Sequence, residues 1–111
     1  MDISYANSRI QKICTEEKTA KKELGSEGAK VLRKRLDQML AAENLEVLRF
    51  APGAWHELKG DRKGQLACGI TSQLRLVFTP ANDPVPTKPD GGLDWSEVTT
   101  VMNIEIIDYH K

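Results

Sequence analysis

Apolar and polar residues alternate along the second half of this chain as they do in β-strands. Apolar residues recur at every second position in residues 65–70 and again in residues 74–78, which is the period that places one face of a strand in a protein core. Residues 55–59 precede them, across a charged turn that has a glycine at each end, residues 60–64. The pattern predicts a meander of three strands, and the β-branched run at residues 98–109 predicts a long final strand.

The first half of the chain has the spacing of amphipathic helices. Residues 2–5 alternate as a short opening strand, and Ser8 with Gln11 three residues later forms a capping box that predicts a helix start. We expect that helix to end at Gly25, with a candidate break at Thr15.

A second helix is predicted to follow Ser26, which can cap its first turn. Its apolar residues fall at steps of three, four, three and one and so form one stripe: Ala29, Leu32, Leu36, Met39 and Leu40. Asn44 then predicts the cap of a short third helix, whose apolar residues are Leu45, Leu48 and Phe50.

The order of a strand, helices and then four strands predicts an α+β fold. We expect the N-terminal strand and two to three helices to pack on one face of a mostly antiparallel sheet of four to five strands. Residues 79–98 interrupt this order with a long excursion, because residues 79–87 hold three of the five prolines. Leu93 and Trp95 are expected to attach the excursion to the rest of the domain.

Composition narrows the class of protein. With 111 residues, of which 40% are hydrophobic and 29% charged, the chain is expected to fold as a single domain, residues 1–111, with a mainly aliphatic core. No apolar run is long enough to span a membrane and residues 1–18 are too polar for a secretory signal, so we expect a cytoplasmic protein without a membrane partner. Cys14 and Cys68 lack the spacing of a disulfide framework or of a zinc site, and both are expected to fill apolar positions.

The formal net charge is zero, but the charges are unevenly distributed. Residues 1–78 hold 14 Lys and Arg against 10 Asp and Glu, whereas residues 79–111 hold 2 against 6. The predicted meander combines one histidine with four cations: His56, Lys59, Arg62, Lys63 and Arg75. Such a surface suits a polyanion, and the plain alternative is a charged surface that only confers solubility.

Counting by two along the strands predicts which side chains lie on the sheet face away from the helices, here called the open face. In the last strand this count assigns to the core Met102, Ile104 and Ile106, and to the open face Val101, Asn103, Glu105 and Tyr109. In the meander it assigns Leu58 to the core, and to the open face Glu57, Lys59 and Arg75. The small residues Ala67 and Gly69 are expected to leave a hollow there.

The same count places three side chains that could act as acids, bases or metal ligands on the face opposite to the open face: His56, Asp108 and His110. They reach the hollow only if a strand end, a twist or a bulge turns them toward it, and bulges do occur beside active sites.

Together these side chains have the chemistry for cleavage of RNA by its own 2′-hydroxyl. That reaction needs a base for the hydroxyl proton, cations for the charge on the phosphate and an acid for the leaving 5′-oxygen. Histidine suits either proton role, since its reference pKa is about 6.5, and Lys59 and Arg75 suit the phosphate. Each residue also has a structural interpretation, as a surface or core histidine, a carboxylate partner, a tyrosine lid or an ion-pair member. A metal site of His56, Asp108 and His110 is a further interpretation, although it lacks a fourth ligand.

Three segments in this order resemble the HigB-type killer toxins of the RelE/ParE superfamily. They are the block His56-Glu57-Leu58-Lys59-Gly60-Asp61-Arg62-Lys63-Gly64-Gln65, the strand Leu74-Arg75-Leu76-Val77-Phe78 and the closing Asp108-Tyr109-His110. The resemblance implies a RelE-like fold and the toxin of a type II toxin-antitoxin system, an mRNA interferase that acts in many members on codons in the ribosomal A site. It implies an endoribonuclease without a metal or other cofactor. Its partners would be mRNA, the ribosome and a HigA-like helix-turn-helix antitoxin, with operator DNA contacted only through the antitoxin.

Carried over by position, the resemblance implies a catalytic set of His56, Asp108, Tyr109 and His110. It also implies RNA contacts by Lys59 and Arg75, beside which we expect Arg62 and Lys63 to bind the RNA backbone. The 79–98 excursion is longer than in compact members, and it could close over the site, contact an antitoxin or have no role. The superfamily includes gyrase-directed relatives, so a non-enzymatic gyrase inhibitor or a transcriptional co-regulator is the alternative, although the histidines and the tyrosine favour the ribonuclease.

Overall fold

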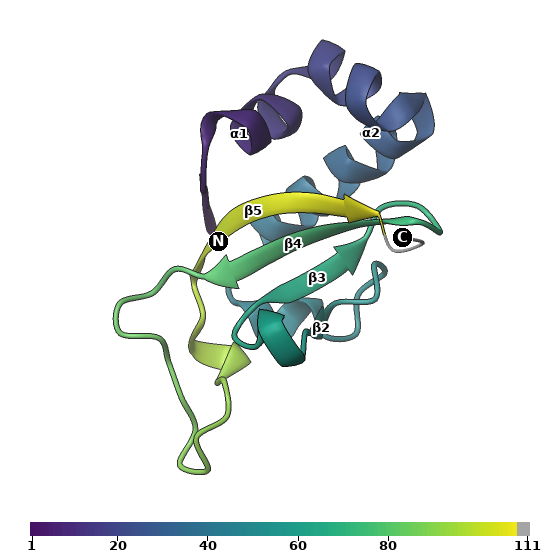
Figure 1. Cartoon of the computed structure of the whole chain (residues 1–111). Helices are drawn as coiled ribbons and strands as arrows, with labels where there is room; N and C mark the ends of the chain where they lie inside the picture. Colours follow the sequence, from purple (N-terminus) through teal and green to yellow (C-terminus); the bar gives the residue numbers. More distant parts are fainter. Residues whose placement is uncertain (109–111) are drawn as a thin grey trace.

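A computed structural model describes residues 1–108 of the chain, whose strands form one sheet in the order β1-β5-β4-β3-β2 (Figure 1). The strands are β1 Asp2–Tyr5, β2 His56–Glu57, β3 Leu66–Gly69, β4 Leu74–Pro80 and β5 Thr100–Asp108. β1 runs parallel to β5, and the other neighbours are antiparallel. The predicted α+β fold and the predicted meander are confirmed.

Two helices, α1 Ser8–Thr15 and α2 Glu17–Ala41, cover one face of the sheet (Figure 1). The cap of α1 is Asn7, whose Oδ1 accepts a hydrogen bond from the Ile10 backbone N–H at 3.1 Å. The predicted capping box at Ser8 is therefore wrong by one residue: the cap is Asn7, one position earlier, and it satisfies the free amide of Ile10 instead of that of Gln11. The predicted break after Thr15 is confirmed, because Glu16 between the helices is extended.

A sharp kink divides α2 at Gly25, where the backbone takes the left-handed φ of 78° that favours glycine. This is where the pattern predicted one helix to end and the next to begin. Most of the predicted apolar stripe of the second half is buried, but Leu40 is 56% exposed. Leu40 is directly next to Met39, so a single helix face cannot bury both.

A short 3₁₀ helix, η1, follows at Leu45–Leu48. The Asn44 side chain caps it by accepting from the Val47 backbone N–H at 3.3 Å, as predicted. Leu45 and Leu48 are buried, whereas Phe50 is 91% exposed. The prediction that Phe50 belongs to this helix is wrong because η1 ends at Leu48 and the next turn directs Phe50 to solvent.

The core lies between the helices and the sheet, with Phe78 of β4 fully buried in it. Trp55 packs edge-on against Phe78, with 5.8 Å between the ring centroids. Cys14 and Cys68 are buried, free cysteines, as expected. Burial raises the pKa of the Cys14 thiol to about 11 and that of the Cys68 thiol to about 12.

A β-bulge in β5 changes which residues face the core. Val77 pairs with Glu105 but the next residue, Phe78, pairs with Asn103, so Ile104 is the extra residue on β5. As a result Val101 and Asn103 face the helices and are completely buried. The predictions that these two lie on the open face and that Met102 lies in the core are wrong, because the bulge shifts the alternation by one position. Ile106 and Glu105, beyond the bulge, keep their predicted faces.

The excursion between β4 and β5 extends from the end of the sheet where β4 finishes and β5 begins (Figure 1). Its base is closed by a hydrogen bond from the Ala81 backbone N–H to the Thr100 carbonyl at 2.9 Å. On its return it forms another 3₁₀ helix, η3 Trp95–Glu97. Trp95 is buried and Leu93 packs against the core, so the predicted attachment by these two residues is confirmed.

Candidate functional site

The open face carries a row of residues that crosses four strands. His56 of β2 pairs with Ala67 of β3, which pairs with Val77 of β4, which in turn pairs with Glu105 of β5. His56 therefore lies on the open face. The sequence predicted His56 on the helix-covered face and Glu57 on the open face, and this prediction is wrong by one residue. In β2 it is Glu57 that pairs with Leu66, whose side chain is in the core.

A hydrogen bond fixes the ring of His56 at the start of β2. Its Nδ1 lies 2.7 Å from the carbonyl oxygen of Ala54. A carbonyl can only accept, so Nδ1 carries the hydrogen and, in the neutral ring, Nε2 has the free lone pair. The imidazole is exposed, and Nε2 is thus the atom that can take up a proton.

The turn before His56 has an unusual backbone that supports this contact. Ala54 has a φ of 53°, which non-glycine residues rarely adopt. Gly53 has a φ of 128°, and a Cβ there would lie 2.7 Å from Nε1 of Trp55, so this position requires glycine. The Gly53 carbonyl accepts from the Gly69 backbone N–H at 2.7 Å, which ties the turn to β3.

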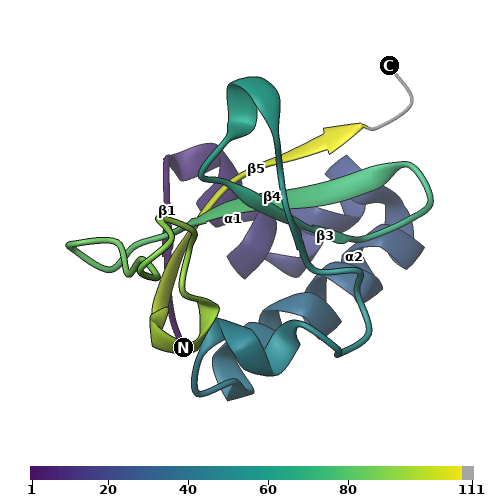
Figure 2. The same cartoon turned by 90° about the horizontal axis from the view of Figure 1, so that it is seen from below.

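A hollow of about 430 Å³ opens beside His56 on this face. Its lining residues are His56, Glu57, Leu58, Lys59, Arg62 and Ile107. Leu58 thus lines the hollow at its half-buried position, and its predicted place in the core is wrong. The hollow was predicted to lie over Ala67 and Gly69, but neither residue lines it. Ala67 and its neighbour Val77 are completely buried. Figure 2 looks onto the open face, where the segment that leads into the 3₁₀ helix η2, Gly60–Arg62, crosses in front of β3 and β4.

Arg62 of η2 makes the contact that holds this segment over the sheet. Its Nη2 lies 2.7 Å from Oε2 of Glu105, and its Nη1 donates to Oε1 of Gln65 at 2.8 Å. Two strands separate β2 from β5, about 5 Å per strand, so the contact requires η2 to lie above the face and not beside its edge. The guanidinium predicted to bind RNA is therefore already paired with a carboxylate.

The other predicted RNA-binding cations are spread around this segment. Lys59 lines the hollow, and Lys63 is exposed just after η2. Arg75 lies on the open face beside Ile107, but its Nη1 donates to the carbonyl oxygens of Thr71 and Leu74 at 3.0 and 3.2 Å. The Arg75 guanidinium is thus held at the β3–β4 turn.

The four predicted catalytic residues have different outcomes. Asp108 pairs with Leu74 and lines a separate hollow beside α1. This hollow is on the helix-covered side of the sheet, where the alternation along the last strand predicted Asp108 to lie. Tyr109 and His110 lie outside the described residues. The structure therefore brings together His56, Lys59 and Arg62 and separates Asp108 from them.

The metal interpretation of His56 and Asp108 loses support from this separation. Within residues 1–108, no three His, Cys, Asp or Glu side chains lie close enough to hold a metal ion. No helix in the same part of the chain is long and apolar enough to cross a membrane.

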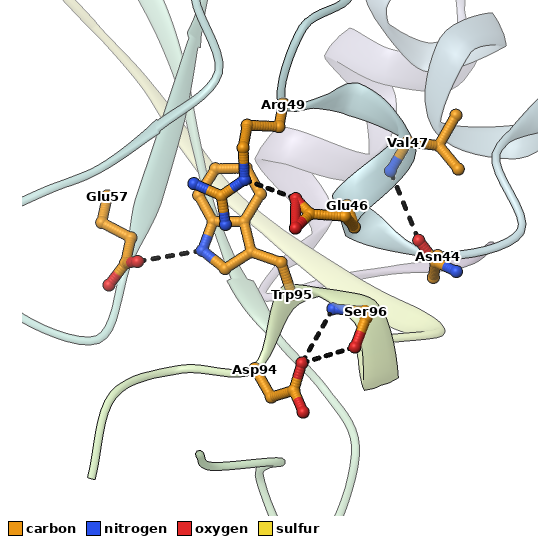
Figure 3. A network of polar contacts seen from close by, with 8 residues as sticks. All are labelled: Asn44, Glu46, Val47, Arg49, Glu57, Asp94, Trp95 and Ser96. Carbon is orange, nitrogen blue, oxygen red and sulfur yellow. Dashed lines mark hydrogen bonds and ion pairs between the residues drawn. The ribbon is translucent and has the colours of Figure 1, made fainter. Parts of the chain in front are cut away.

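Several residues of the site were not singled out in the sequence. Glu105 was predicted on the open face but given no role, and nothing in its spacing indicates Arg62 as a partner. Ile107 lines the hollow because the bulge restores its face. Glu57 accepts a hydrogen bond from the Trp95 indole N–H at 2.9 Å, which links the excursion to β2 (Figure 3).

Comparison with known proteins adds one result. No protein-family model matches the sequence, and no curated protein matches it. Among solved structures, the chain is similar to a YoeB/ParE toxin from Agrobacterium tumefaciens, with a TM-score of 0.61, 12% sequence identity, and coverage of 97% of this chain and 98% of that one. The chain therefore shares the fold of that protein over nearly its whole length.

Proposed function

We propose that this chain is the toxin of a type II toxin-antitoxin system and an endoribonuclease that cleaves mRNA in the cytoplasm. The finer parts of the proposal are a HigB-type toxin, action on the ribosome, and a HigA-like helix-turn-helix antitoxin as partner. The observation that carries it is the exposed His56, with Nε2 available as a base, beside the Lys59 cation in the same hollow.

In the proposed mechanism, Nε2 of His56 removes the proton from the 2′-hydroxyl of the RNA. The 2′-oxygen then attacks the adjacent phosphorus, and the 5′-oxygen leaves. Lys59 stabilises the charge that develops on the phosphate oxygens, with Arg75 and Lys63 holding the neighbouring backbone. We assign to His110 the role of the acid that protonates the leaving 5′-oxygen, because it is the other histidine of the catalytic set that the family resemblance implies.

Growth arrest tests the catalytic part of this proposal. Expression of the wild-type chain is expected to stop growth and to cleave mRNA, and a His56→Ala, His110→Ala double variant is expected to do neither. A folded double variant with undiminished arrest would refute the assignment. Lys88→Ala is the matched control, because Lys88 lies in the excursion at the far end of β4 and is expected to leave the arrest unchanged.

Salt dependence tests the RNA-binding part. If Lys59 and its neighbours bind phosphates, affinity for RNA should fall steeply between about 50 and 200 mM salt. Lys59→Gln should weaken binding and reduce the slope by about one contact. If the RNA affinity of the wild type does not change with salt, these cations are surface charges that do not bind phosphates.

The engagement of Arg62 by Glu105 favours the second candidate function, a non-enzymatic binding module of the same fold. Such a protein would inhibit gyrase or act as a transcriptional co-regulator with its antitoxin. Inhibition of DNA supercoiling with intact mRNA would select the gyrase inhibitor over the ribonuclease.

A further inference from the structure

Strand β2 is too short to fix its own register. It pairs with β3 through two residues, His56 and Glu57. Successive strand residues point to opposite faces, and a shift of one residue exchanges them. Contacts outside this two-residue ladder therefore help to keep His56 on its face. Two of them are backbone hydrogen bonds to the residues around β3, from the Leu58 N–H to the Gln65 carbonyl at 2.9 Å and from the Gly69 N–H to the Gly53 carbonyl at 2.7 Å.

Glu57 makes such a contact through its side chain: although the residue also lines the hollow, it pairs with the core residue Leu66 and its carboxylate is directed toward Trp95. Its Oε2 accepts a hydrogen bond from Nε1 of Trp95 at 2.9 Å (Figure 3). A bond between a carboxylate and an indole N–H is charge-assisted and directional. While Glu57 is held in this way, the alternation of the strand keeps His56 on the open face.

Trp95 is itself held in place, so it can serve as a fixed point. It is buried, and the guanidinium of Arg49 lies 4.0 Å from its ring centroid (Figure 3). Arg49 is in turn paired with Glu46 of η1. The Asp94 side chain caps η3 by accepting from the Ser96 backbone N–H at 3.1 Å.

We propose that Trp95, which the 79–98 excursion contributes, is a positioning residue that keeps His56 facing the hollow through Glu57. This assigns the excursion a role that differs from closing over the site, since its hydrogen bond acts from the opposite face of the sheet. The catalytic consequence depends on the proposed ribonuclease function, but the orientation of His56 does not.

The test compares variants that break or keep the Glu57–Trp95 hydrogen bond. Trp95→Phe removes the indole N–H and keeps an aromatic ring, and Glu57→Leu removes the acceptor from an exposed residue. Glu57→Gln keeps an amide oxygen that can accept the same bond. Leu93→Ala is the control, because Leu93 also packs the excursion against the core but makes no contact that this proposal requires.

The first measurement is independent of activity. The ¹⁵N chemical shifts of the His56 ring, taken at the alkaline end of a pH series, report which nitrogen carries the hydrogen. A His110→Gln background assigns the signals, since the chain has two histidines. We expect the Nδ1–H tautomer in the wild type, Glu57→Gln and Leu93→Ala, and a mixture of tautomers in Trp95→Phe and Glu57→Leu. Wild-type shifts in both of the last two variants would overturn the proposal.

The second measurement is RNA cleavage. Trp95→Phe and Glu57→Leu are expected to lower kcat about ten- to a hundredfold with KM changed less than about twofold, because a misplaced catalytic group affects the chemical step more than binding. Glu57→Gln should restore kcat. If Trp95→Phe fails to fold, Glu57→Leu alone decides the proposal. If the wild type cleaves no RNA, the ribonuclease function fails and the tautomer measurement still decides whether Trp95 positions His56.

Discussion

The two faces of the sheet are built in different ways. The helix-covered face buries Leu66, Leu76 and Phe78 completely against α1 and α2. The open face is covered at its centre by the η2 segment, which is held by directional contacts such as the ion pair of Arg62 with Glu105 and the hydrogen bond from Thr79 Oγ1 to the Gly64 carbonyl. Apolar contact over a large area maintains the first face, whereas a few directional contacts maintain the second.

This difference separates stability from function. Burial at the helix-covered face supplies most of the free energy of folding, since that energy scales with the apolar area removed from water. Exposed ion pairs contribute little, about 0.2 to 1 kcal/mol. The open face can therefore exchange its contacts for those of a ligand without unfolding the sheet.

The largest expected effect is on the helix-covered face. Phe78→Ala should lower the free energy of unfolding by about 3 to 5 kcal/mol, because it leaves a cavity beside Trp55. Phe50→Ala is the same chemical change at a residue that is 91% exposed and should alter stability by less than about 0.5 kcal/mol. Urea denaturation of both variants measures the contrast. Equal losses would mean that Phe50 is buried in solution, for example in an interface.

The buried thiols predict a loss of stability at high pH. The pKa of Cys14 is raised from 9.0 to about 11 and that of Cys68 from 9.0 to about 12. A raised pKa means that the folded state holds the proton more tightly, so the stabilisation is complete below pH 9 and is lost as the pH rises toward these values. Each thiol should cost on the order of 1 kcal/mol at pH 10 relative to pH 8.

The control for this effect is a Cys14→Ala, Cys68→Ala variant. It will be less stable overall, but its decline in the free energy of unfolding between pH 8 and 10 should be smaller by the sum of these two costs. Parallel declines in the two proteins would show that the thiols do not carry the effect. Burial also predicts that a thiol reagent at pH 8 labels the cysteines only on unfolding.

The smallest expected effect is at the Arg62–Glu105 ion pair. A double-mutant cycle with Arg62→Gln and Glu105→Gln should give a coupling free energy of about 0.2 to 1 kcal/mol. If RNA competes with Glu105 for the guanidinium, Glu105→Gln should also tighten RNA binding, and only when Arg62 is present. Glu97→Gln makes the same change of charge on η3. A similar gain in that control would indicate a general electrostatic effect.

The helix-covered face could be predicted well because its pattern has few exceptions. Leu32, Leu36, Leu76 and Phe78 repeat with the periods of a helix and a strand, and burial follows from those periods. The bulge at Ile104 could not be predicted, since nothing in the residues around it marks an extra position. One such residue exchanged the faces of Val101, Met102 and Asn103.

The candidate site could be predicted as a set of residues but not as an arrangement. The block from His56 to Lys63 was identified by its charge, and the structure does place His56, Lys59 and Arg62 together. The face of His56 was missed because β2 is two residues long, too short for alternation to be decisive. Asn103 shows the same limit: its Oδ1 is buried and has no hydrogen-bond partner within residues 1–108, which no sequence pattern signals.

The way in which Asn82 closes the base of the excursion makes the chain beyond it a separable insertion. Its Oδ1 accepts from the backbone N–H groups of Thr99 and Thr100 at 3.1 and 3.3 Å, and its Nδ2 donates to Oγ1 of Thr99 at 3.0 Å. β4 and β5 are thus joined at this point whatever the length of residues 83–93. Changes of length between residues 83 and 93 are therefore expected to leave the sheet unchanged, and a fluorescent reporter or an affinity tag placed at Asp90 should leave the register of both strands intact.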